Sequence, residues 1–77
     1  MACVDDRGTL TPIAAAILRA LGAEGATPAA VARASGLPLY RVRAGLRELA
    51  DAGFAREGEG GAFTASESGV ARLAATP

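Results

Sequence analysis

The chain has no histidine, no lysine and no tryptophan, and its 77 residues include a single cysteine, Cys3. A zinc site needs several histidine or cysteine ligands, so the sequence predicts no metal centre. One cysteine cannot form a disulfide within the chain, and we expect Cys3 to be an inert thiol. Chemistry that depends on metal ligation or on an internal cross-link is therefore not expected.

Long apolar runs are also missing. The longest spans only residues 13–18, which is far too short to cross a bilayer. The first twenty residues lack the basic segment and the apolar segment of a signal peptide. These absences favour a cytoplasmic protein that is not embedded in a membrane.

Catalytic constellations are scarce as well. Glu57 and Glu59 could resemble an acid pair, but they flank a glycine-rich turn that cannot hold two carboxylates rigidly. The sequence "GEGG" of that turn, residues 58–61, lacks the lysine and the following helix of a phosphate-binding loop. We therefore expect neither an enzyme nor a bound cofactor, and we interpret the two acids as a solvated tip.

Charge is balanced overall but unevenly distributed along the chain. Eight arginines balance eight acidic residues, so the net charge does not by itself indicate a nucleic-acid partner. The segment 25–47 nevertheless contains four arginines and no acid, whereas the segments on either side are net acidic. The arginines of this basic segment are Arg33, Arg41, Arg43 and Arg47.

Two helices are predicted by the same start signal. Thr11 and Thr27 are each followed by proline, which combines a side-chain cap with a residue suited to the first helical turn. Apolar residues then recur at helical spacing, and Gly22 and Gly36 provide the stops. Gly36 is also suited to a tight turn between two helices.

A third helix is predicted over residues 38–52, ended by Gly53. On a helical wheel Val42, Leu46 and Leu49 define a core side, and Leu39 falls on the same side. The opposite side carries Tyr40, the small residue Ala44 and arginines. This is the helix that carries most of the basic segment.

After Gly53 the helical pattern stops and a hairpin is predicted. Its arms are residues 54–57 and 62–64, joined by the glycine-rich turn, with Phe54 and Phe63 facing inward. Thr64 and Glu67 have the spacing of a capping box. A last helix is expected to follow, with Val70 and Leu73 on its apolar side.

The chain is short enough for one domain only. Residues 1–9 show no periodic pattern and are interpreted as a mobile tail. Residues 10–77 form the predicted domain, which is mainly α with a small β-hairpin.

From Thr27 to Leu73 the sequence "TPAAVARASGLPLYRVRAGLRELADAGFAREGEGGAFTASESGVARL" resembles the winged helix-turn-helix domains of small bacterial and archaeal transcription regulators. The matching features are the "VARASGLP" turn, the apolar trio of "VRAGLREL", the "DAGF" before the wing and the "FTASESGVARL" after it. The resemblance implies a three-helix core, a two-stranded wing and a C-terminal helix. It also implies binding to double-stranded DNA as a homodimer, with the third helix in the major groove.

Specific contact residues follow from the resemblance. The residues of the third helix that would contact bases differ from the residues that would contact phosphates. The expected base contacts are Tyr40, Arg43, Ala44 and Arg47, and the expected phosphate contacts are Arg33, Ser35, Arg41 and Arg56.

An alternative is a protein-interaction module of the same fold that does not bind DNA. It would dock onto an acidic protein partner through the basic face, or onto a partner through its first and last helices. The zero net charge and the acidic wing, with Glu57 and Glu59, favour this alternative. A dimer surface on the terminal helices would draw on the apolar residues Leu10, Ile13, Ile17, Val70 and Leu73.

Overall fold

A computed structural model describes residues 10–75 of the chain, and within that range it is mainly helical with a two-stranded antiparallel sheet. The predicted tail at residues 1–9 and the last two residues lie outside the described residues. In chain order the elements are α1 (Pro12–Leu21), α2 (Pro28–Ser35), α3 (Leu39–Asp51), β1 (Ala55–Glu57), a 3₁₀ turn (Glu59–Gly61), β2 (Phe63–Ala65) and α4 (Glu67–Ala74).

The first two helices begin as their threonine–proline pairs predict. The hydroxyl oxygens of Thr11 and Thr27 each accept a hydrogen bond from a backbone N–H three residues later, at 3.3 Å. Gly36 ends α2 in the left-handed conformation, with φ of 76°. The turn between α2 and α3 therefore has the glycine that its geometry requires.

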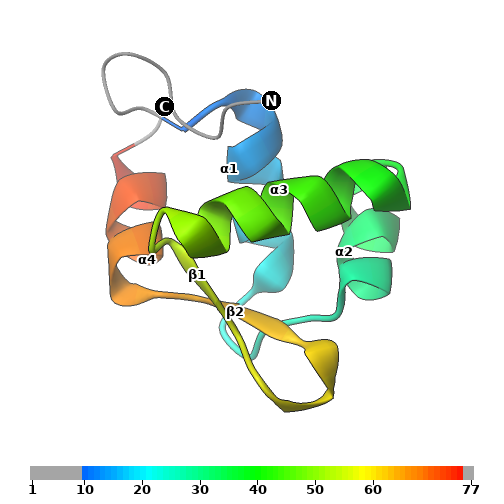
Figure 1. The fold of residues 1–77 in the computed structure, drawn as a ribbon. Helices are drawn as coiled ribbons and strands as arrows, with labels where there is room; N and C mark the ends of the chain where they lie inside the picture. Colours follow the sequence, from blue (N-terminus) through cyan, green and yellow to red (C-terminus); the bar gives the residue numbers. More distant parts are fainter. Residues whose placement is uncertain (1–9, 76–77) are drawn as a thin grey trace.

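The core lies where the first three helices meet. α3 crosses α1 in Figure 1, and α2 lies beside the N-terminal end of α3. Six side chains from these three helices are almost completely buried, namely those of Ile17, Leu21, Val31, Val42, Leu46 and Leu49. Leu39, expected on the core side, is 37% exposed, because it occupies the first position of α3, beyond most of the core.

The hairpin forms as predicted, except that its first strand begins one residue later and its second strand is shifted by one residue. Glu57 pairs with Phe63, and Ala55 pairs with Ala65. Phe54 is buried and Phe63 is half-buried against the core, so both aromatic rings face inward as expected. The connection is a short 3₁₀ turn that is kinked at Gly60, whose φ of 73° favours glycine.

A pairing that the sequence did not predict joins the hairpin to the α1–α2 loop. Ala26 donates its N–H to the carbonyl of Phe63 and accepts the N–H of Phe63, both at 2.9 Å. The pairing fixes β2 against the residue that immediately precedes the Thr27 cap of α2. The end of β2 next to the turn is thus attached to the start of α2.

The predicted start of the last helix is wrong. The cap is Ser66, not Thr64: its hydroxyl oxygen accepts the Gly69 N–H at 3.0 Å and donates to the carbonyl of Gly53. Thr64 stays extended because it lies within β2 and pairs with Arg56. Backbone pairing with the neighbouring strand therefore overrides the local capping signal.

The last helix, α4, packs on the junction between α3 and the hairpin. Leu73 lies against the core, whereas Val70, also expected on the apolar side, is 57% exposed. Gly69 is buried, and a Cβ atom added there would collide with the carbonyl group of Phe54. The guanidinium carbon of Arg72 lies 5.1 Å from the centre of the Phe54 ring.

None of the helices within residues 10–75 has the length and apolar character needed to cross a membrane.

Candidate functional site

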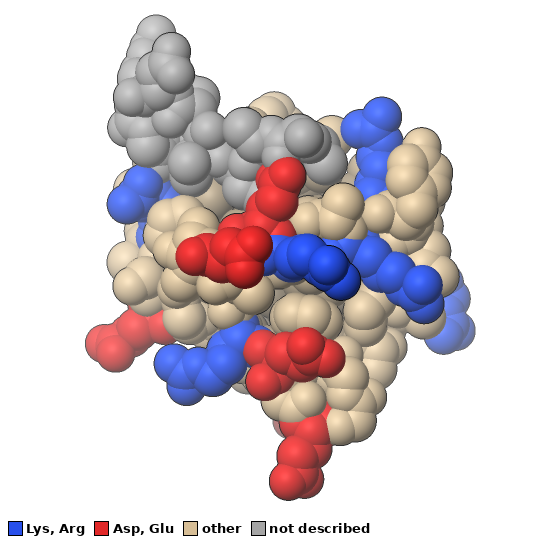
Figure 2. All heavy atoms as spheres, viewed as in Figure 1, with Lys and Arg blue, Asp and Glu red and all other residues tan. Residues whose placement is uncertain are grey.

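The outward side of α3 presents five neighbouring side chains to solvent. Tyr40 is 71% exposed, and the four residues Arg41, Arg43, Ala44 and Arg47 are exposed as well. Figure 2 shows this face, with arginine side chains over the first part of α3 and acidic side chains over its last turn and over the hairpin. The predicted base-contact residues therefore share one exposed surface, which we call the α3 face.

The charges of α3 oppose its helix dipole. A helix carries partial positive charge at its N-terminus and partial negative charge at its C-terminus, so acids suit the first turn and cations the last. α1, α2 and α4 follow this rule, with Arg19, Arg33 and Arg72 in their last turns. α3 instead has Arg41 near its start and Asp51 as its final residue.

No ion pair within the described part of the chain offsets this arrangement for Arg41, Arg43 or Arg47. The N-terminus of α3 also lacks a side-chain cap, because Pro38 occupies that position. An anion that approached this end would interact favourably with both the arginines and the dipole.

Arg41→Ala and Arg33→Ala are therefore expected to change stability in opposite directions. Removing Arg41 relieves repulsion with the α3 dipole and should raise the free energy of unfolding by about 0.3 to 1 kcal/mol at low salt. Removing Arg33 from the last turn of α2 should lower it by a similar amount. Urea unfolding at about 20 mM salt measures both values, and the difference should shrink in concentrated salt.

The two variants control for each other because both remove an exposed arginine and introduce the same helix-favouring residue. Equal destabilisation by both would show that the dipole does not distinguish the two positions.

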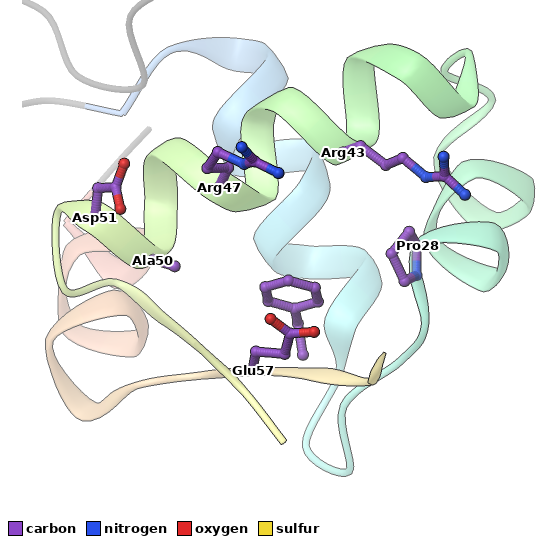
Figure 3. A pocket seen from close by; sticks show the side chains of 7 residues that line it. Pro28, Arg43, Arg47, Ala50, Asp51 and Glu57 are labelled. Atoms are coloured by element: carbon purple, nitrogen blue, oxygen red, sulfur yellow. The ribbon is translucent and has the colours of Figure 1, made fainter. Parts of the chain in front are cut away.

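A groove of about 490 Å³ runs between α3 and the hairpin. Figure 3 shows Arg43 and Arg47 extending from α3, and Glu57 extending from β1 toward α3, with Pro28 at the α2 end. The complete lining is Pro28, Arg43, Arg47, Ala50, Asp51, Glu57 and Phe63. We call this hollow the α3–hairpin groove.

The groove combines two predicted base-contact residues with side chains that the sequence did not place beside them. Glu57 and Phe63 are direct partners in the antiparallel ladder, so their side chains project from the same face of the hairpin. Arg56 follows the alternation of a strand and does not line the groove. The groove therefore holds two arginines and two acids, with the half-buried Phe63 among them.

Two predicted phosphate contacts, Arg33 and Ser35, differ in how available their side chains are for a new contact. Arg33 is exposed in the last turn of α2. The Ser35 hydroxyl donates to the carbonyl of Val31 at 2.7 Å and accepts the N–H of Leu37 at 3.2 Å. Its only hydrogen is therefore already used in the turn, and a phosphate contact would require that bond to break.

Within the described range, no group of three or more histidine, cysteine, aspartate or glutamate side chains is arranged to hold a metal ion. Comparisons of the chain with models of protein families, with curated proteins and with solved structures find no significant match.

Proposed function

We propose that this chain is a winged helix-turn-helix protein that binds double-stranded DNA through α3 and regulates transcription in the cytoplasm, without catalysing a reaction. The observation that carries the proposal is the α3 face, on which exposed arginines with no ion-pair partner among the described residues extend along α3 from its uncapped, positive N-terminal end. The element order supports the fold, because three helices are followed by a hairpin and a further helix. The Ala26–Phe63 pairing supports it too, since it attaches the hairpin to the helical core.

In this proposal the N-terminal half of α3 enters the major groove. Arginine can form two hydrogen bonds with the O6 and N7 atoms of guanine, which assigns base reading to Arg43 and Arg47. Tyr40 would reach a neighbouring base, and the small side chain of Ala44 would let the helix approach a thymine methyl group.

Phosphate contacts would come from the edges of the same surface. Arg41 on α3 and Arg33 on α2 flank the reading residues, and Arg56 is the cation of the hairpin. These contacts would fix the orientation of the protein on the duplex without reading sequence. A homodimer would add affinity, and the apolar side chains available for pairing are the exposed Val70 and the half-buried Ile13 and Leu73. Leu10 and Ile17, by contrast, are buried in the core of the chain itself.

Duplex binding that weakens steeply with salt is the expected result for the wild-type chain. Each neutralised phosphate releases condensed cations, so three phosphate contacts predict a slope of about −3 in log affinity against log salt per chain. Fluorescence anisotropy with a labelled duplex of about 20 base pairs, from about 50 to 200 mM salt, measures this slope. No association with any duplex at the lowest salt would contradict the proposal.

That negative result would favour the alternative, a protein-interaction module of the same fold. The acidic side chains beside the α3 face, Asp51 and Glu57, are the observation in its favour, because they lie where a phosphate backbone would approach. A module of this kind would use the exposed arginines to dock onto an acidic surface of a protein partner.

A further inference from the structure

We propose that Glu57 limits the affinity of the α3 face for DNA, because its carboxylate in the α3–hairpin groove weakens attraction to the phosphates of a duplex of any sequence. The inference rests on the proposed function, binding of duplex DNA through α3. It assigns a role to an acid that has no apparent place in an anion-binding surface.

The position of Glu57 is the first step. Its side chain extends from β1 toward α3 and lines the same groove as Arg43 and Arg47 (Figure 3). Its partner in the ladder is the uncharged Phe63, so no cation faces it across the hairpin. A negative charge therefore stands beside the proposed reading residues.

The second step is that the fold does not require this carboxylate. Glu57 is exposed, and no hydrogen bond or ion pair joins it to another residue in the described part of the chain. Glutamate is also a poor residue for a β-strand, where β-branched and aromatic side chains are favoured. Neither pairing nor strand formation explains the presence of Glu57. We therefore infer that Glu57 acts on the molecule that approaches the groove.

The third step concerns the range of the forces involved. Attraction between arginines and phosphates acts over the Debye length and does not depend on base sequence. Hydrogen bonds between arginine and guanine act only at contact and depend entirely on sequence. A carboxylate in the groove opposes the first force at every site, whereas correct base contacts restore affinity only at the right site. Repulsion of this kind lowers affinity for every duplex by a similar factor, and it leaves the ratio of preferred to random affinity, which comes from base contacts, nearly unchanged.

Glu59 provides an internal comparison. It carries the same charge and lies in the 3₁₀ turn at the tip of the hairpin, but it does not line the groove. Neutralising Glu57 should therefore have a larger effect than neutralising Glu59. Glu24, in the turn between α1 and α2, is exposed and does not line the groove either, so Glu24→Gln controls for the change in net charge.

The test compares the wild-type chain with Glu57→Gln, Glu59→Gln and Glu24→Gln on two labelled duplexes of about 20 base pairs. One duplex has random sequence, and the other is the preferred sequence recovered by repeated selection with the wild-type protein. At about 50 mM salt, Glu57→Gln should bind the random duplex about threefold to tenfold more tightly than wild type. The ratio of preferred to random affinity should stay nearly unchanged in this variant, because both affinities rise together, while Glu24→Gln should leave both affinities as they are in the wild type.

Failure of the inference can be separated from failure of the proposed function. If the wild type and every variant bind no duplex, the proposed function is wrong and the inference is overturned with it. If the wild type binds but Glu57→Gln binds the random duplex no more tightly than Glu24→Gln does, only the inference is overturned. A weaker preferred complex in Glu57→Gln, with random binding unchanged, would also overturn it, because Glu57 would then be accepting a hydrogen bond from a base such as cytosine.

Discussion

Replacement of both Arg43 and Arg47 by alanine is expected to lower affinity for the preferred duplex by about 100-fold or more. Both arginines lie on the exposed α3 face and line the α3–hairpin groove, and neither has an ion-pair partner within residues 10–75. Loss of a bidentate contact with guanine costs about 1 to 3 kcal/mol for each arginine. Anisotropy titration of the double variant against the preferred duplex measures the loss.

The fold should survive these substitutions, because both side chains are exposed and alanine favours the helix. The loss of affinity can be assigned to the two arginines only if thermal unfolding gives the double variant a melting temperature close to that of the wild type. Arg19→Glu is the matched control, since it lowers the net charge by the same amount from the outward side of α1. Equal loss of affinity in this control would assign the effect to overall charge instead of to α3.

Gly69→Ala is expected to destabilise the chain by about 2 to 4 kcal/mol, although alanine is the better helix former by about 1 kcal/mol. The new Cβ would overlap the carbonyl group of Phe54, which is backbone and cannot rotate away as a side chain can. α4 would have to move outward, away from the Ser66 bonds and the Leu73 contact that hold it. Urea unfolding followed by circular dichroism measures the change.

Two substitutions separate this collision from ordinary helix effects. Ser68→Ala, at an exposed position of α4, should change stability by less than about 0.5 kcal/mol. Gly45→Ala places a Cβ 2.5 Å from the Cδ1 atom of Ile17, the end of a side chain that can shift, so its cost should be smaller than that of Gly69→Ala. A Gly69→Ala protein as stable as the wild type would show that α4 is not held closely against Phe54.

The helices could be predicted because their signals are local. Thr11 and Thr27 cap helices whose first residue is proline, and these caps need no information from the rest of the chain. Leu39 was misplaced because a helical wheel gives an angle around the axis, not the extent of the core along it. The start of α4 was misplaced because Thr64 and Ser66 are both suitable caps, and strand pairing decided between them.

The site could be predicted only in part, because one of its features depends on pairing between distant segments of the chain. The exposure of Tyr40 and Arg47 follows from their angle to the buried side of α3, so the α3 face could be predicted from the sequence. The α3–hairpin groove could not be predicted, because it depends on how far the hairpin folds back toward α3. The pairing of Ala26 with Phe63 helps to fix that position, and a single paired alanine leaves no strand pattern in the sequence.

The Ala26–Phe63 pairing also bears on how the chain folds. It joins a loop in the first half of the chain to a strand near the end, so it closes a long loop and carries a large entropic cost. The contacts among α1, α2 and α3 are closer in sequence and can form before that loop closes. We therefore expect the hairpin to dock onto helices that have already formed, which completes both the core around Phe63 and the groove beside α3. On this order the groove assembles late in folding, and its loss should be among the first events when the chain unfolds.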